Sequence, residues 1–237
     1  NLIMPELNNF ITLLDGAEYK GYIIALFTLA AGLARPFSGK LADTIGRKRV
    51  MFVGLFVSIA ANFAYPFVSA IWMFLLLRFF HGFSTGFHPT GATAMVSDIL
   101  PEKRRGEGMG IFGTAMSLGL GLGQFLGSPI ANWVGINGLF IAAAIVGVIS
   151  TLLLLRVQET LDNKLKFKRK MLHVKRHEIF DPLVTPVAIT MFLSAYCSGL
   201  ILVLTPDLSG YLGIENKGLF FIFYVASTIV VRTFMGK

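Results

Sequence analysis

Long apolar runs, each close to the length needed to cross a lipid bilayer, dominate this sequence. A hydrocarbon core of about 30 Å requires roughly 20 apolar residues in a helix, and in lipid a helix satisfies its own backbone hydrogen bonds. With 54% hydrophobic and 14% charged residues, the chain is predicted to be an all-α membrane protein. The predicted helices cover residues 20–39, 50–68, 70–97, 107–133, 138–156, 183–206 and 216–236.

The opening residues are apolar but too few to span a bilayer. We interpret residues 1–7 as the end of a helix whose start is missing, with Pro5 near its end, followed by a polar loop over residues 8–19.

Lysine and arginine are concentrated in every second connection. Residues 40–49, 103–105 and 156–176 contain 15 of them, whereas the loops on the other side contain only Lys20 and Lys217. The positive-inside rule places the basic connections in the cytoplasm. Topology therefore accounts for the net charge of +8, and no interleaving of aromatic and basic residues indicates nucleic-acid binding. We expect a multi-pass protein of the inner or plasma membrane whose surroundings are the lipid bilayer.

The basic segment 157–182 is the predicted cytoplasmic linker between an N-terminal bundle, residues 1–156, and a second bundle that begins at residues 183–237. Two interpretations fit its run Lys164–Lys170. One is an amphipathic helix on anionic lipid, and the other, which the charge pattern favours, is a solvated loop that fixes orientation.

Part of the sequence is duplicated at an offset of 197 residues, with seven identities. The matched residues are Arg35, Phe37, Gly39, Lys40 with Arg232, Phe234, Gly236, Lys237, and Glu18, Lys20, Gly21 with Glu215, Lys217, Gly218. After a four-residue shift, Pro5–Leu7 also matches Pro206–Leu208. Both copies enter the membrane with the same polarity, so the repeat is a parallel duplication about an axis along the membrane normal. This is an architecture of transporters.

The segment Arg35–Arg49 has a specific pattern that resembles the signature loop between helices two and three of the major facilitator superfamily. Gly39, Leu41, Asp43, Gly46, Arg47 and Lys48 stand at the motif positions. The resemblance covers the whole chain and implies twelve helices in two six-helix bundles. The chain would then hold the first bundle, with an incomplete first helix, and the first two helices of the second bundle, truncated at both ends.

The family resemblance implies that this loop is a conformational latch, with Asp98 at the end of the fourth helix as its partner. From the residues alone, Asp43 and Arg47 can pair with each other, with Asp98 or with a helix end. The plainer interpretation is a basic turn that sets topology, although charge alone does not require Gly39 and Gly46.

Arg78, His81, Thr85 and His88 are spaced three, four and three residues apart, which places them on one face of a helix. Burying an arginine in the membrane costs about 2.5–3.5 kcal/mol, so Arg78 is expected to face a cavity or a partner rather than lipid, and the shared row favours a cavity. The family's second motif has arginine here, with glutamine where this chain has His81, a group that titrates near neutral pH. We predict Arg78 for coupling, and His81 and His88 for protonation or solute contact, with simple packing as the alternative for each histidine. Family geometry adds Tyr196 to the cavity.

Gly119, Gly123 and Gly127 are four residues apart and predict close helix packing. The run Gly119–Ser128 also resembles the family's antiporter motif, with Gln124 where that motif has proline.

Several enzyme-like motifs carry no weight. Gly82–Gly86 and Gly108–Gly113 match a hydrolase elbow and a dinucleotide loop, but no strand precedes either. His173 and His177 lack further metal ligands, and the single cysteine, Cys197, excludes an internal disulfide. We expect no metal, no cofactor and no enzyme activity.

These features predict a secondary transporter that works by alternating access, with proton-coupled efflux of small organic molecules as the favoured function. The alternatives are proton-coupled uptake of a metabolite and a receptor or scaffold that does not transport. A receptor would not require Arg78 in the bilayer. The expected partners are a small-molecule substrate and protons, and the expected state is a monomer.

Overall fold

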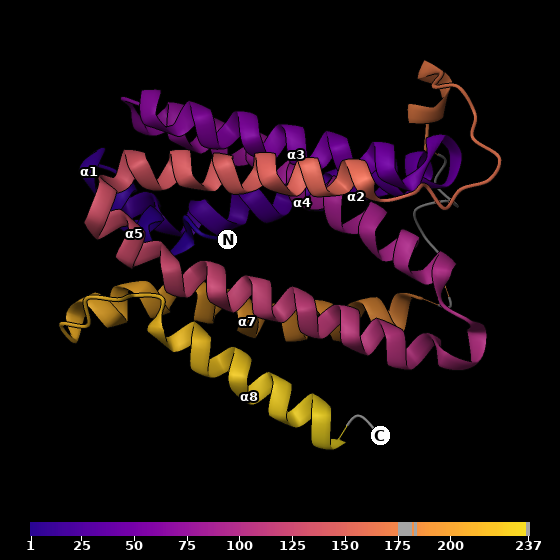
Figure 1. Ribbon diagram of the computed structural model, residues 1–237. Helices are drawn as coiled ribbons and strands as arrows, with labels where there is room; N and C mark the ends of the chain where they lie inside the picture. Colours follow the sequence, from indigo (N-terminus) through magenta and orange to yellow (C-terminus); the bar gives the residue numbers. More distant parts are fainter. Residues whose placement is uncertain (175–181, 183, 236–237) are drawn as a thin grey trace.

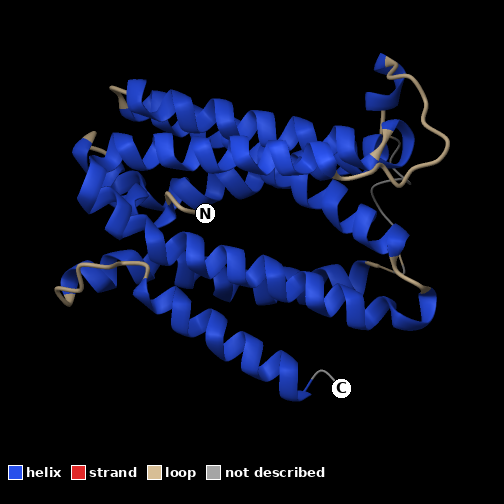
Figure 2. Ribbon diagram, viewed as in Figure 1, coloured by secondary structure: helices blue, strands red, loops and turns tan. Residues whose placement is uncertain are grey.

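The computed structural model describes residues 1–174, 182 and 184–235, and all regular secondary structure among them is helical (Figure 2). The helices are α1 (Leu7–Leu13), α2 (Lys20–Ile45), α3 (Arg47–Ala64), α4 (Ile71–Ile99), α5 (Arg105–Arg156), α7 (Thr185–Tyr211) and α8 (Leu219–Met235). Single 3-10 turns occupy Met4–Glu6, Ala17–Tyr19, Tyr65–Phe67, Glu102–Arg104 and Arg169–Leu172. The predicted all-helical membrane fold is confirmed.

The long α5 is two helices joined at Gly135. This residue has φ 77° and ψ 170°, a conformation that is costly for any residue with a Cβ atom. The chain reverses there, so that residues 105–134 run in one direction and residues 136–156 return (Figure 1). The predicted break between residues 133 and 138 therefore lies at one glycine.

Four described segments are long and apolar enough to cross a membrane, namely Ala17–Ile45, Arg47–Phe67, Glu102–Arg156 and Thr185–Tyr211. The third has 55 residues, about 80 Å of helix at 1.5 Å per residue, which is enough for two crossings. Helix α4 falls outside this set because its polar row lowers its mean hydropathy, yet it lies alongside α2 and α3 (Figure 1).

The polar loop predicted over residues 8–19 is wrong for its first half, where α1 (Leu7–Leu13) forms. One side of α1, including Phe10 and Ile11, is buried, and the Phe10 ring lies 5.1 Å from the ring of Phe140. An amphipathic helix of this kind has low mean hydropathy, and only its periodicity distinguishes it from a loop.

The basic turn predicted over residues 40–49 is almost entirely helical. Helix α2 continues to Ile45 and α3 begins at Arg47, so only Gly46, with φ 121° and ψ 145°, leaves the helix. Helix α7 also continues past its predicted end at Pro206 to Tyr211. A proline removes one backbone hydrogen bond, and in this apolar segment the helix still satisfies most of the remaining backbone groups.

The first half of the linker has little regular structure. Leu165 donates its backbone N–H to the Thr44 carbonyl at 2.8 Å, and helical structure is limited to the turn Arg169–Leu172. Of the two interpretations of Lys164–Lys170, the structure favours the loop. His177 lies outside the described residues.

Helix α4 packs closely on both of its neighbours because glycines remove side chains at the contacts. A Cβ atom at Gly86 would lie 2.5 Å from Ala34 of α2, and one at Gly54 of α3 would lie 2.5 Å from the backbone nitrogen of His88. Ser38 of α2 also donates to the Gly86 carbonyl at 2.6 Å. These contacts fix the polar row of α4 in the interior.

Helix α8 packs against α5, whereas α7 contacts α2 (Figure 1). We call the end of the molecule with Gly46 and the linker the basic end, and the end with Gly135 and Lys217 the opposite end. Both α2 and α8 run from the opposite end to the basic end (Figure 1), as a parallel duplication requires. The last repeat residues, Gly236 and Lys237, lie outside the described part of the chain.

Candidate functional site

A cluster of charged and polar side chains surrounds the junction of α2 and α3. Arg47 pairs through Nη1 with Asp43 Oδ1 at 2.5 Å and through Nε with Asp98 Oδ2 at 3.1 Å. Thr160 donates its hydroxyl to the same Asp98 oxygen at 2.6 Å. These residues, together with Glu159, form what we call the turn cluster, and they connect α2, α3, α4 and the start of the linker.

Glu159 is the member of the turn cluster that sequence reasoning missed. Its carboxylate accepts the backbone N–H groups of Arg47 at 2.9 Å and Lys48 at 3.1 Å, which caps the start of α3. Lys48 in turn donates Nζ to the carbonyls of Leu155 and Val157 at the end of α5. Glu159 thus places a negative charge at the start of α3, and Lys48 places a positive charge at the end of α5. No spacing along one helix signals these contacts.

Gly39 lies one turn of α2 before Asp43 and faces a pocket of about 560 Å³ between α2 and α4. No atom of the described residues lies within 4 Å of the position that a Cβ atom would take at Gly39. Among its walls are the small side chains of Ala42, Thr90 and Ala94. Packing within the described structure therefore does not require glycine at this position.

The polar row of α4 lines a single pocket of about 340 Å³, the central pocket, whose other walls come from α2, α3, α5 and the N-terminal residues. Arg78, His81, Thr85 and His88 all reach it. Tyr196 does not, because it lies on α7 with 65% of its surface exposed. In the described part of the chain, no three histidine, cysteine or acidic side chains gather closely enough to hold a metal ion.

Arg78 is 1% exposed and is held by neutral groups. Its Nε donates to the Ile23 carbonyl at 3.1 Å, and Nη1 donates to the Tyr65 hydroxyl at 3.4 Å. Its guanidinium carbon lies 4.4 Å from the centre of the Phe27 ring, a cation–π distance. No carboxylate of the described residues forms an ion pair with Arg78, so its charge is solvated by dipoles and an aromatic face.

The two histidines of the row differ in their surroundings. His81 is 7% exposed, and both ring nitrogens have hydroxyl partners, Tyr65 at 3.2 Å and Ser58 at 3.4 Å. His88 is partly buried and its imidazole has no hydrogen-bond partner among the described residues. His88 is therefore the freer of the two to meet a solute or exchange a proton in the central pocket.

The three glycines predicted to pack together on α5 have different surroundings. Gly127 lies against the backbone of the N-terminal segment, Gly123 is in ordinary contact with it, and Gly119 has no described atom near its Cβ position. The close approach of α8 to α5 occurs at Gly121, where a Cβ atom would lie 2.6 Å from Val225. The GxxxG spacing alone did not reveal which face meets α8.

Comparisons with known proteins agree with these features. The family model described as Major Facilitator Superfamily matches residues 3–237. An uncharacterized MFS-type transporter of Methanocaldococcus jannaschii is 33% identical over 149 residues, which is 62% of this chain and 39% of that protein. A homolog of the multi-drug resistance efflux pump PmrA from Lactococcus lactis is 34% identical over 158 residues, covering 65% and 39% of the two chains.

A more distant relative is the quinolone resistance protein NorA of Staphylococcus aureus, 25% identical over 179 residues, covering 73% of this chain and 45% of NorA. The chain thus spans less than half the length of these curated relatives. Among solved structures, the human organic anion transporter MFSD10 matches with a TM-score of 0.54 and 24% identity, covering 76% of this chain and 43% of that one. The chain therefore belongs to the Major Facilitator Superfamily, a family of multi-pass membrane transporters of small molecules rather than of enzymes.

Proposed function

We propose that the protein is a proton-coupled exporter of small organic molecules that works by alternating access between two bundles. The observation that carries this proposal is the central pocket, where a cationic and two imidazole side chains face one cavity among apolar helices. Charged groups inside a membrane segment usually mark a solute or proton pathway. The names of the PmrA homolog and NorA as resistance proteins support export.

Within this proposal, Arg78 is the coupling residue and His88 the more exposed contact for a proton or solute. The Arg78 guanidinium has no acidic partner in the described residues. A proton or a charged solute that enters the central pocket therefore changes the electrostatic energy of Arg78 directly. The turn cluster is the latch of the basic end. By the positive-inside rule, this end lies on the cytoplasmic side of an inner or plasma membrane. The working unit is a monomer, since each chain carries both copies of the repeat.

Flux measurements on the full-length protein in proteoliposomes test the proposal. A mixed library of anionic, cationic and neutral solutes is loaded, and a pH gradient of either sign is imposed. We expect at least one solute to move opposite to the protons, and Arg78→Gln to abolish this movement. Arg104→Gln is the matched control, because that arginine is exposed and pairs only with Glu107 at i,i+3 among the described residues.

Proton-coupled uptake is the second candidate. It is favoured by Gln124, which stands where the family's antiporter motif has proline and is buried in α5 with 1% exposure. Without that proline, α5 keeps its backbone hydrogen bond at this position. In the same flux assay, uptake predicts that solute and protons move together, and a protein that moves no solute under either gradient would favour a receptor or scaffold.

A further inference from the structure

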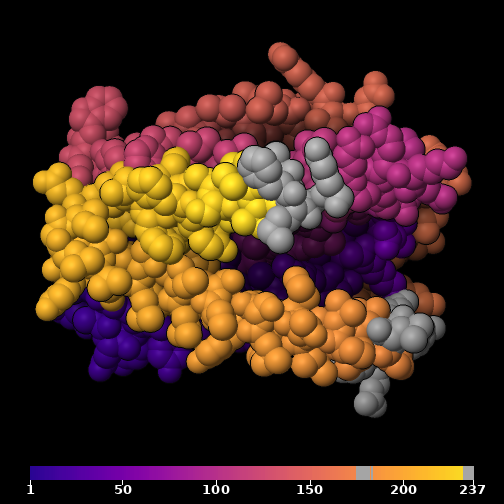
Figure 3. All heavy atoms as spheres, turned by 90° about the horizontal axis from the view of Figure 1, so that it is seen from below, coloured from indigo at the N-terminus to yellow at the C-terminus, as the bar shows by residue number. Residues whose placement is uncertain are grey.

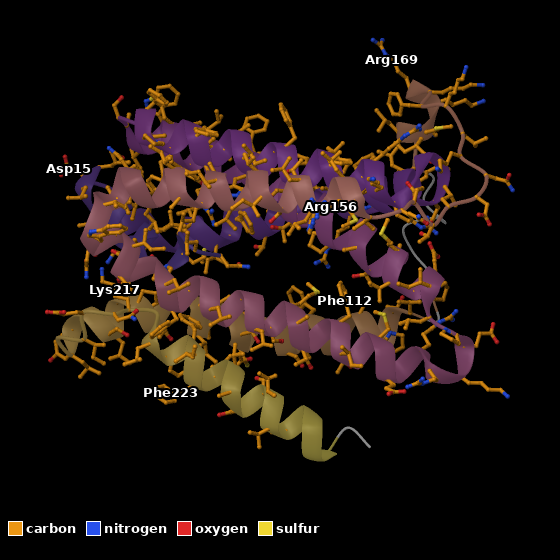
Figure 4. All side chains as sticks on the ribbon, in the orientation of Figure 1. Asp15, Phe112, Arg156, Arg169, Lys217 and Phe223 are labelled. Atoms are coloured by element: carbon orange, nitrogen blue, oxygen red, sulfur yellow. The ribbon has the colours of Figure 1, made fainter. Side chains whose placement is uncertain are left out.

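Two ion pairs tie α7 and α8 to the first helices of the chain. Glu6 Oε2 lies 3.1 Å from Lys217 Nζ, which is just before α8. Asp207 Oδ2, near the end of α7, lies 3.0 Å from Lys20 Nζ at the start of α2. Both pairs are at the opposite end of the molecule, where Figure 4 shows Lys217 close to the bend of α5. We call them the crossed ion pairs.

The internal repeat relates the crossed ion pairs to each other. Lys20 matches Lys217 at the offset of 197, and Glu6 matches Asp207 within the Pro-acid-Leu segments. The acid of each copy therefore binds the lysine of the other copy. A two-fold relation between two copies produces this exchange, because a contact from residue i to residue j is repeated from j to i. The pairs are thus a single symmetric device.

Further polar contacts support both acids. Glu6 Oε1 accepts from the Ser128 hydroxyl at 2.7 Å, and Oε2 also accepts from Asn9 at 2.8 Å. Asn8 donates to Asp207 Oδ1 at 3.0 Å. The Glu6 and Lys217 side chains are 8% and 15% exposed, whereas those of Lys20 and Asp207 are 29% and 44% exposed. Breaking the buried pair therefore costs more than breaking the exposed one.

Other hydrogen bonds between α7 or α8 and the first five helices lie at the same end as the crossed ion pairs. Asn8 donates to the Val203 carbonyl and to Asp207, and Asn216 donates to the Phe125 carbonyl. Figure 3 shows α7 and α8 diverging away from that end, with the indigo and purple first helices visible between them. The described side chains therefore join the two copies of the repeat at the opposite end.

We propose that the crossed ion pairs are the gate of the opposite end. They hold the two bundles together while the central pocket opens to the basic end, and both must break before the pocket opens to the other side. This inference rests on the proposed function only in requiring that the bundles rock against each other. When the bundles separate at this end, water solvates all four charged side chains. Hydration offsets part of the cost of breaking the ion pairs, so both states remain accessible.

A labelling experiment on the full-length protein tests the gate without any substrate. Cys197 and any cysteine outside residues 1–237 are replaced by serine, and Val225→Cys places a reporter that is 4% exposed against Gly121. A membrane-impermeant maleimide is added from the side of the opposite end. We expect Glu6→Gln to raise the labelling rate at least about tenfold, and the exchange of charges in Glu6→Lys with Lys217→Glu to return it to within about twofold of the parent.

Lys20→Gln is the matched control within the chain, since it breaks the exposed pair and is expected to raise the rate only about twofold. Lys217→Gln replaces Glu6→Gln if the latter does not elute as a monodisperse peak. Equal labelling of all variants, or an exchanged double variant as fast as Glu6→Gln, would overturn the gate. If the protein transports a solute but labelling is the same in all variants, the gate is refuted and the proposed function stands. If labelling changes as expected but no solute moves, the gate stands and the proposed function is refuted.

Discussion

Gly46 is the position where the contribution of the α2–α3 turn to stability can be worked out from the structure. Its φ of 121° disfavours any residue with a Cβ atom by about 1–3 kcal/mol. A Cβ atom there would also collide with the Glu159 carboxylate, and loss of that cap from α3 costs about 1 kcal/mol more. We therefore expect Gly46→Ala to destabilise the protein by about 3 kcal/mol.

Gly39→Ala is the natural comparison, because Gly39 is helical and has no described atom near its Cβ position. Alanine is favoured over glycine in a helix by about 0.5–1 kcal/mol. We expect Gly39→Ala to keep or slightly raise stability and yet to slow transport several-fold, because a helix of the second bundle would meet the added methyl group when the basic end closes. Stability and transport should thus be affected at different glycines.

The measurement is the apparent midpoint of thermal unfolding of the full-length protein in detergent, at one scan rate because unfolding of such proteins is often irreversible. At 2–4 °C per kcal/mol, Gly46→Ala should lower the midpoint by about 6–12 °C. Proteoliposome flux is measured on the same samples. A wild-type midpoint for Gly46→Ala, or an equal loss of midpoint in Gly39→Ala, would refute this reasoning.

Three further predictions concern single side chains. Asp43→Asn should lower the unfolding midpoint by no more than about 4 °C, because the Asp43 side chain is 70% exposed and such pairs contribute at most about 1 kcal/mol. It should nevertheless slow transport, and normal turnover would contradict a latch. His88→Gln should change the pH profile of flux while His81→Gln leaves it unchanged, since only His81 has hydroxyl partners at both ring nitrogens; the reverse result would assign protonation to His81. Glu159→Gln should lower the midpoint by about 1–4 °C, and less at high salt; an equal loss at all salt concentrations would exclude a charge effect on α3.

The sequence was most informative about elements whose formation depends on local composition. A helix that crosses a bilayer needs only enough apolar residues in a row, so most spans and the break near Gly135 could be predicted. The amphipathic α1 (Leu7–Leu13) was missed, because its apolar residues are buried by partners distant in sequence, such as Phe140. The continuation of α2 to Ile45 was also missed, because charged residues at a helix end lower the mean hydropathy in the same way as a loop does.

In the candidate site, too, the features that depend on local spacing could be predicted, and those that depend on contacts between helices could not. Spacing on one helix was enough to place Arg78 and His88 in one pocket, because helical periodicity fixes which residues share a face. Spacing does not determine which other helix that face meets, so it gave no signal for Glu159. Tyr196 came from family geometry and does not line the described pocket, and its role in a solute cavity stays a prediction. The repeat did contain a usable signal, since equivalent acids and lysines in two symmetric copies predict exchanged contacts.

The turn cluster and the crossed ion pairs also influence the relative free energies of the two states of the transport cycle. The turn cluster satisfies its own charges among α2, α3, α4 and the linker, whereas the crossed ion pairs join the two copies. Alternating access requires two states within a few kcal/mol of each other. Loss of the crossed ion pairs should therefore favour the state in which the basic end is closed. A methyl group at Gly39 should instead hinder closure of the basic end and favour the state described here.

Glu6→Gln and Gly39→Ala consequently act in opposite directions on the labelling of Val225→Cys, the first raising the rate and the second lowering it. The two sites lie at opposite ends, so their effects on free energy should add, and the double variant should label at a rate between those of the single variants. A Gly39→Ala protein that labels faster than its parent would show that closing the basic end does not bring a second helix against Gly39. In that case the turn cluster would serve only to hold the α2–α3 turn.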